Sequence, residues 1–293
     1  MPPAETPFGF INANKPPGIT STAFGSRVRH ALGRVPLGHW GTLDPDASGV
    51  LVLAVGHATR LLPFLGDGRK TYEFDLVLGS KTETGDASGA VLSSGAVPDN
   101  WREELPAVAS SLIGSLLQVP PMYSAVKVDG QPLYKRARRG EDVERPAREV
   151  EIFSLRVHSY GDDRARLAVE CSAGTYVRTL CEEIGRRLGV PAHMDALVRV
   201  AAGPFILERA VAAELVLADP LACLINPLDV LTLPRIDIRS EDATVFCHGN
   251  AVTVSDVIAT GEVLITVNGR LLGVGRASDS PAGTTLQPTR VFS

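Results

Sequence analysis

The sequence is poor in cysteine, and its four cysteines are widely separated. A chain of 293 residues carries only Cys171, Cys181, Cys223 and Cys247, with no Cys-x-x-Cys pair. Structural zinc sites and the disulfide frameworks of small secreted proteins need close, regular spacings. We therefore expect reduced, buried thiols. The histidines also show no metal-ligand spacing, so the sequence predicts no metal site.

The sequence also lacks a long hydrophobic run and a basic N-terminal segment followed by an apolar stretch. It starts Met-Pro-Pro-Ala-Glu, and only 5% of its residues are aromatic although 44% are hydrophobic. A membrane-spanning helix needs about 20 mostly apolar residues, and a secretory signal begins with positive charge. We therefore expect a cytoplasmic, globular protein with no membrane contact. Its length suits one large domain and a smaller one.

An excess of positive charge is likewise missing. The formal net charge is -4, which gives no overall attraction to nucleic acid. The distribution is uneven, because the segment of about 131–150 is basic: between Lys135 and Arg148 it has three more basic than acidic side chains. Its basic residues are Lys135, Arg136, Arg138, Arg139, Arg145 and Arg148. Such a segment can follow a phosphate backbone or form a solvated loop, and charge alone does not distinguish these.

Strand and helix patterns alternate through the first three quarters of the chain. Strands are expected at residues 8–12, 49–56, 70–78 and 164–171. Helices are expected from Thr20 or Ser21 to near Gly33, at 99–113, and at 176–188, where five apolar residues follow helical spacing and Gly189 gives a stop. This order predicts a mixed α/β or α+β domain.

The pattern changes after the Pro-containing segment 226–234. Short alternating apolar segments with glycine between them follow, including 263–267 and 271–274, and they favour a small β-barrel. We therefore place a large domain at residues 1–233 and a small one at 234–293.

One carboxylate stands out because it lies in a constrained turn. Asp44 precedes Pro45, which favours extended backbone angles at Asp44, while Gly41 and Gly49 allow sharp turns or close approach by a bound molecule. An apolar strand follows directly. Such a turn is often structural, but it makes Asp44 a candidate catalytic residue.

Arg178 is the second unusual position. It is expected in the first turn of the helix at 176–188, off the apolar stripe. The helix dipole disfavours a cation at that end. A negative group nearby would explain its presence.

Four separated segments together resemble the bacterial tRNA pseudouridine-55 synthases. They are Lys15-Pro-Pro-Gly-Ile-Thr-Ser21, residues 39–51, Pro120-Pro-Met-Tyr-Ser-Ala-Val-Lys127, and Gly174-Thr-Tyr-Val-Arg-Thr-Leu180. Each is weak alone, but their order and spacing are specific. The end of the chain resembles a PUA domain, a small RNA-binding β-barrel. The resemblance implies an α+β pseudouridine-synthase fold, with a mainly antiparallel central sheet flanked by helices.

The resemblance implies roles for particular residues. Asp44 is expected as the catalytic aspartate, with Tyr72 and Arg178 as the active-site tyrosine and arginine. Tyr72 would stack on the target uracil, Tyr176 and Leu197 would line the pocket, and His39 would lie against the RNA. Lys15 and Lys127 are expected as pocket-wall or RNA-facing residues. Arg178 would then pair with Asp44, and we expect this pairing to depress the pKa of Asp44.

The implied reaction isomerises uridine 55 in the T-loop of tRNA to pseudouridine, which requires no cofactor. The aspartate would act as a nucleophile or as a base, and the sequence does not distinguish these. The T-loop and stem would be held by the basic segment and the C-terminal barrel. We expect a monomer with no obligatory protein partner.

Two other functions fit parts of the pattern. Asp44 and Asp46 could be the paired carboxylates of a hydrolase. We expect instead that their side chains point to opposite faces of this extended segment and that Asp46 caps the turn. Alternatively, the chain could be a non-catalytic RNA-binding protein that uses the barrel and the basic segment. The loop 81–89 is expected as a surface turn near the active site, because it lacks a Walker Lys-Ser/Thr pair and calcium-loop spacing.

Overall fold

The computed structural model describes residues 7–292, apart from 125, 129, 142 and 256–258. The segment 1–6, on which the expectation about export rests, and Asp142 of the basic segment lie outside the described residues. Within the described part of the chain, no helix is long and apolar enough to cross a membrane.

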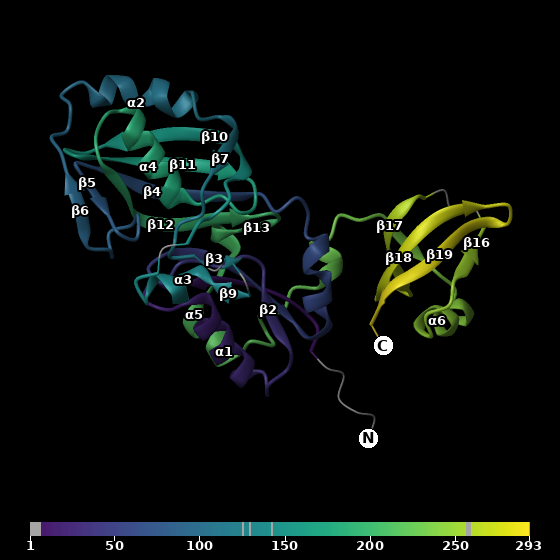
Figure 1. Cartoon of the computed structure of the whole chain (residues 1–293). Coiled ribbons are helices and arrows are strands. Elements are labelled where there is room, and N and C mark those ends of the chain that lie inside the picture. Colours follow the sequence, from purple (N-terminus) through teal and green to yellow (C-terminus); the bar gives the residue numbers. More distant parts are fainter. Residues whose placement is uncertain (1–6, 125, 129, 142, 256–258, 293) are drawn as a thin grey trace.

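A ten-stranded sheet forms the centre of the larger part of the molecule (Figure 1). Most of its neighbouring strands are antiparallel, as predicted; the parallel pairs are β1 with β14 and β3 with β12. Its main path runs β14 (Val211–Ala212), β1 (Gly9–Lys15), β3 (Ser48–Val55), β12 (Ala192–Ala202), β4 (Lys70–Leu78), β11 (Arg164–Cys171), β10 (Arg148–Tyr160) and β7 (Gly114–Gln118). Strand β2 (Leu37–His39) adds to β3, and β13 (Phe205–Ile206) adds to β12.

Helices and short hairpins surround this sheet. Figure 1 shows α2 beside β10, and α1 beside α5. Helix α4 packs mainly on β12, and α5 packs on β1. The helices of this part are α1 (Ser21–Ala31), α2 (Trp101–Ser110), α3 (Leu133–Ala137), α4 (Val177–Arg187) and α5 (Ala213–Ala218), with 3-10 turns η1 (Gly56–Phe64), η2 (Leu207–Arg209) and η3 (Pro227–Asp229). The hairpins are β5 (Ser80–Thr82) with β6 (Val91–Ser94), and β8 (Lys127–Val128) with β9 (Gln131–Pro132).

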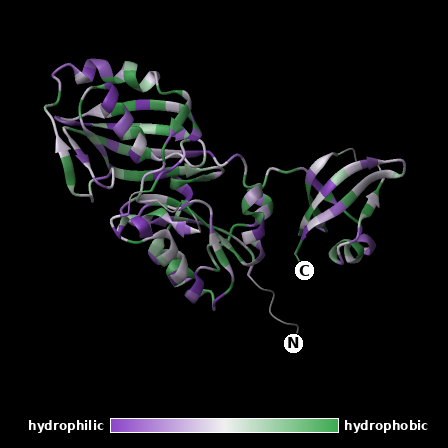
Figure 2. Cartoon of the chain, in the orientation of Figure 1, coloured by the Kyte–Doolittle hydropathy of each residue, from purple (hydrophilic) through white to green (hydrophobic). Residues whose placement is uncertain are grey.

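The local sequence explains these elements. Helix α1 begins where Thr20 accepts a hydrogen bond from the Ala23 N–H at 3.0 Å, which satisfies a free donor of the first turn. Strand β3 is buried along nearly its whole length, as its unbroken apolar run predicts. Strand β4 instead alternates, and Tyr72 and Phe74 face the core. In Figure 2, hydrophobic and hydrophilic bands follow one another along the strands of the sheet and along the helices around it.

The C-terminal part is a separate five-stranded sheet with one helix. Its strand order is β15 (Arg235–Asp237), β17 (Gly261–Val267), β18 (Arg270–Ser280), β19 (Gly283–Val291) and β16 (Val252–Val254), with helix α6 (Ser240–Cys247) beside β19 and β16. Helix α6 was not expected from the sequence. This sheet has its own apolar core, and apolar residues of β17 and β18, together with Phe292, also pack on the larger part. There, Phe292 contacts Phe8 with ring centroids 5.4 Å apart, and Arg60 donates to the Val291 carbonyl at 2.9 Å.

Candidate active site

Asp44 lies in the turn between β2 and β3, and buried polar side chains fix that turn. The Ser21 hydroxyl donates to the Leu43 carbonyl at 3.0 Å and accepts from the Leu43 N–H at 2.8 Å. The Lys15 ammonium donates to the Pro45 carbonyl at 3.1 Å. Both residues flanking Asp44 are therefore held by the beginning of the chain.

Arg199 holds the same turn from β12. Its guanidinium donates to the carbonyls of Val50 at 2.7 Å and Gly41 at 3.1 Å, and the residue is completely buried. Gly49 is required beside it, because a Cβ there would lie 2.3 Å from the Arg199 carbonyl, and its φ of +99° disfavours other residues. No sequence pattern pointed to this role of Arg199.

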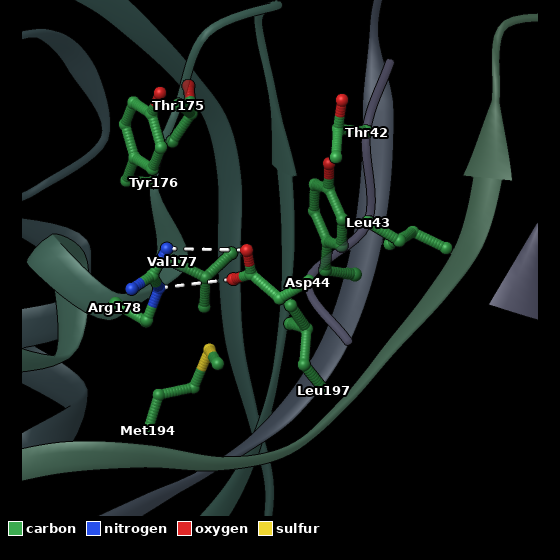
Figure 3. Close-up of a pocket in the computed structure, with 10 residues that line it drawn as sticks. Thr42, Leu43, Asp44, Thr175, Tyr176, Val177, Arg178, Met194 and Leu197 are labelled. Atoms are coloured by element: carbon green, nitrogen blue, oxygen red, sulfur yellow. Dashed lines mark hydrogen bonds and ion pairs between the residues drawn. The ribbon is translucent and has the colours of Figure 1, made fainter. Parts of the chain in front are cut away.

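The structure brings Arg178 to Asp44, as the unusual first-turn cation predicts. The guanidinium lies 3.1 Å from Asp44 Oδ2 through Nε and 3.3 Å from Oδ1 through Nη2, which is a bidentate arrangement (Figure 3). Two backbone carbonyls complete the site, because Nη1 donates to Thr84 and Nη2 to Tyr123, each at 2.8 Å. The Arg178 side chain is 4% exposed, so these partners replace its hydration.

Asp86 is a second carboxylate near this guanidinium, and its role was not expected from the sequence. Its Oδ2 lies 3.8 Å from Arg178 Nη1. Thr84 and Ser88 donate to its other oxygen at 2.6 Å. The loop 81–89 is therefore close to the site, as expected, and supplies both a carbonyl and a charge to it.

The prediction of a depressed pKa for Asp44 is wrong in direction. Burial disfavours the ionised carboxylate and raises the pKa of Asp44 above its ordinary value; Arg178 opposes this, and the nearby charge of Asp86 adds to it. The sequence revealed the cation but not the depth of the site or the second acid. Asp44 is therefore a stronger base than an ordinary aspartate.

The carboxylate opens into a small pocket of about 80 Å³, here called the Asp44 pocket. Figure 3 shows Tyr176 and Thr175 on one side of the ion pair and Met194 on the other. The wall is largely apolar and includes Tyr72, whose pKa is raised mainly by burial, so its phenol is neutral. The lining residues are Thr42, Leu43, Asp44, Tyr72, Thr175, Tyr176, Val177, Arg178, Met194 and Leu197.

A wider cleft of about 750 Å³ shares Asp44, Arg178 and Leu197 with the Asp44 pocket. Its lining also includes Asp46, Tyr134 and other residues of the segments 84–88 and 123–138. A flat, ring-shaped group could enter the Asp44 pocket while its attached chain remains in the cleft. Asp46 lines only the cleft and is exposed.

Three other predicted residues lie outside the Asp44 pocket. His39 is half-buried at the end of β2, and burial lowers its pKa, so it is neutral. Lys127 is exposed on β8. Lys15 is a correction: it is fully buried, neither in the pocket wall nor facing RNA. It donates to three backbone carbonyls, and burial lowers its pKa to about 8.

The basic side chains of the segment 131–150 differ in their exposure and in their partners. Arg136 lies 3.0 Å from Glu141, and Arg145 donates to the Pro120 carbonyl at 3.3 Å. Arg139 is exposed but lies 3.7 Å from the same glutamate. Lys135, Arg138 and Arg148 are exposed, and Arg138 lines the cleft.

The described residues contain no group of three or more His, Cys, Asp or Glu side chains arranged to hold a metal ion. The groups that the site offers are a partly exposed carboxylate, whose side chain is 36% exposed, an oriented guanidinium and an apolar wall. These groups suit proton transfer or nucleophilic attack on an enclosed ring-bearing substrate.

Family comparisons match nearly the whole chain. Residues 29–177 match "TruB family pseudouridylate synthase (N terminal domain)". Residues 178–231 match "tRNA pseudouridylate synthase B C-terminal domain", and residues 234–292 match "Pseudouridine synthase II TruB, C-terminal".

Individual relatives agree with these matches. A tRNA pseudouridine synthase B of Stutzerimonas stutzeri is 43% identical over 281 residues, covering 92% of each chain. One of Heliobacterium modesticaldum is 39% identical over 296 residues, covering 97% of this chain and 95% of its own. A solved chain from "Crystal Structure of a Cbf5-Nop10-Gar1 Complex" superposes with a TM-score of 0.72 at 26% identity, covering 98% of this chain and 85% of that one.

Proposed function

This chain belongs to the TruB family of pseudouridylate synthases and is a tRNA pseudouridine synthase, an isomerase, and from this we propose that its target is uridine 55 in the T-loop. The observation that carries the proposal is the bidentate Asp44–Arg178 pair at an apolar pocket. Two of the four segments that resemble the uridine-55 enzymes, 39–51 and 174–180, supply this pair and much of the pocket wall.

The reaction breaks the N1–C1′ bond, turns the uracil, and joins C5 to C1′. It involves no net oxidation or hydrolysis. We place the ionised Asp44 at the ribose as the base that removes the proton on C2′ while the N1–C1′ bond breaks, and its raised pKa makes it a better base. The protonated Asp44 returns this proton to C2′ when C5 bonds to C1′, and the proton displaced from C5 ends on N1. Attack on C1′ is the alternative role. Replacing the hydrogen on C2′ by deuterium should slow the reaction if Asp44 removes that proton, and should leave the rate nearly unchanged if Asp44 attacks C1′.

The apolar wall has two tasks in this proposal. Uracil is free of the ribose during the reaction, so the pocket must hold it and exclude water. Tyr72 stacks on the base, while Tyr176 and Leu197 enclose its edges; all three line the Asp44 pocket. Arg178 orients Asp44 and keeps it ionised in this enclosed site.

The base must leave the folded T-loop to reach Asp44. Turning a base out of its stack costs a few kcal/mol, and protein groups must replace the lost contacts. We propose that half-buried His39 fills this place beside the RNA. The exposed Lys127, Lys135, Arg138 and Arg148 then contact the backbone of the T-loop and stem.

We also propose that the two parts of the chain have different roles. Residues 1–233 carry catalysis, and residues 234–293 form a PUA-like unit that contacts the same tRNA. The two parts share an apolar contact at Phe8 and Phe292, which would fix the second unit relative to the cleft. We propose that one monomer acts on one tRNA.

The test is incubation of the purified protein with an unmodified tRNA transcript, followed by chemical detection of pseudouridine. We expect product at position 55 and none in a transcript carrying cytidine there. Modification at another uridine would refute the proposed target, and binding without product would refute catalysis.

A further inference from the structure

Strand β12 is irregular where it passes the Asp44 pocket. Asp195 lies opposite Asp75 of β4, and Val198 lies opposite Glu73. Three steps along β12 therefore correspond to two along β4, which is the signature of a β-bulge with one extra residue. Ala196, within the bulge, has a φ of +47°, in the left-handed region that alanine rarely adopts.

The bulge determines which side chains face the pocket. In a regular strand, residues separated by an odd number of positions point to opposite faces. Met194 and Leu197 are three apart, yet both line the Asp44 pocket. The extra residue reverses the alternation between them, so Leu197 is directed inward and is only 8% exposed. Arg199, two residues further on, keeps the same inward phase and is completely buried.

Side chains satisfy the backbone groups that the bulge removes from the sheet. The Ala196 N–H donates to Asp195 Oδ1 at 2.7 Å. Its carbonyl accepts from Arg166 Nη1 at 3.1 Å. Arg166 belongs to β11 and lies opposite Asp75, so its side chain reaches across β4 to the bulge.

Arg166 is itself held in place by the strand that it crosses. Nη1 donates to Asp75 Oδ1 at 3.0 Å, and Nη2 to Glu73 Oε2 at 3.3 Å. The Arg166 side chain is 27% exposed and Asp75 is 21% exposed, so solvent screens these contacts only in part. The two acids are the cross-strand partners of the residues on either side of the bulge, Asp195 and Val198.

We propose that Arg166 is a positioning residue for the isomerisation: it holds Ala196 in its left-handed conformation and thereby directs Leu197 into the Asp44 pocket. The proposal rests on the function given above, in which Leu197 encloses the uracil. Without this guanidinium, the Ala196 carbonyl loses its hydrogen-bond partner, and fewer contacts hold Ala196 in its left-handed conformation. The strand can then relax toward regular alternation, which turns Leu197 away from the base.

The test compares Arg166→Met with Arg164→Met. Arg164 is the matched control because it lies two residues away on the same strand, is more exposed, and reaches Asp195 only at 3.8 Å. We expect Arg166→Met to lower kcat on unmodified tRNA by about tenfold to a hundredfold, as for a small displacement of an aligned group. KM should change by less than about twofold, because the tRNA backbone contacts remain. Arg164→Met should keep the wild-type kcat.

A glycine at the bulge provides the decisive readout. Glycine adopts positive φ without the penalty paid by alanine, so Ala196→Gly in the Arg166→Met background should restore most of kcat. A general loss of stability would not be repaired in this way. Thermal unfolding of each variant identifies any that do not fold. If Arg166→Met does not fold, Arg166→Lys, which keeps one donor, replaces it and should give an intermediate kcat.

The inference is overturned if Arg166→Met, or Arg166→Lys in its place, turns over like the wild type. It is equally overturned if kcat falls and Ala196→Gly does not restore it. Failure of the proposed function is distinguishable, because then the wild-type protein itself would form no pseudouridine at position 55.

Discussion

Replacement of Arg178 by lysine tests whether oriented hydrogen bonds, rather than positive charge alone, prepare Asp44. The arginine donates to both Asp44 oxygens and to the carbonyls of Thr84 and Tyr123. An ammonium carries its three N–H donors on one nitrogen and cannot reproduce this planar fork. Arg178→Lys therefore keeps the charge and loses at least one bond to Asp44 and one to a carbonyl.

The expected size of the defect follows from those two bonds. A hydrogen bond involving a charged group contributes about 1.5–3 kcal/mol, so two losses at the lower end give about 3–4 kcal/mol. Since 1.36 kcal/mol corresponds to a factor of ten in rate, we expect about a 10²–10³-fold fall in kcat. Single-turnover formation of pseudouridine on an unmodified transcript measures it.

The control for this prediction is Arg186→Lys on the same helix. Arg186 is exposed and pairs with Glu183 rather than with the Asp44 pocket, so its replacement should leave kcat unchanged. If Arg178→Lys keeps a rate within about tenfold of wild type, charge alone suffices and the argument from geometry fails.

Three further predictions concern pH, the Asp44 turn and salt. The ionised Asp44 is the reactive form and its pKa is raised, so the acidic limb of the pH–rate profile should lie at a higher pH than an ordinary aspartate would give. Asp86→Asn removes a negative charge that raises the pKa of Asp44, so it should move this limb to lower pH. A shift of the limb to higher pH would contradict the assignment. Lys15→Met should reduce kcat by releasing the Pro45 carbonyl. Because the pKa of Lys15 is about 8 in the folded protein and 10.5 in the unfolded chain, Lys15 makes the free energy of unfolding of the wild type rise between about pH 8 and 10.5. Denaturant titrations should show that the variant lacks this contribution, and the same pH dependence in both proteins would refute the prediction. The affinity for tRNA should fall steeply with salt, and Arg138→Ala should reduce the slope by about one ion without changing the chemical step; an unchanged slope would remove Arg138 from the RNA interface.

Much of the fold could be predicted because its local signals agree with its tertiary packing. The apolar run of β3, the alternation of β4 and the apolar stripe of α4 correspond to what each element buries. Helix α6 was missed because it is only eight residues long and begins with Ser240-Glu241-Asp242, which show no apolar periodicity. The β12 bulge could not be predicted either, because the side chain that satisfies the Ala196 carbonyl comes from β11, two strands away in the sheet.

The candidate site was predicted more fully in its residues than in its electrostatics. A cation in the first turn of α4 implied a nearby anion, and the structure supplies Asp44. The direction of the Asp44 pKa shift depends on the depth of burial and on Asp86, which reaches the site from a loop distant in sequence. Lys15 was expected in the pocket wall or facing RNA because the resemblance implied it, but tertiary packing buries it beneath the turn that it supports.

The most direct measurement is pseudouridine formation at position 55 of an unmodified tRNA transcript by Asp44→Asn, alongside Asp46→Asn and the wild-type protein. Asparagine keeps the size and much of the hydrogen bonding at residue 44 but removes the carboxylate. We expect Asp44→Asn to bind the transcript and form no detectable product, while Asp46→Asn, whose parent side chain lies outside the Asp44 pocket, stays close to wild type. Substantial turnover by Asp44→Asn would contradict the account.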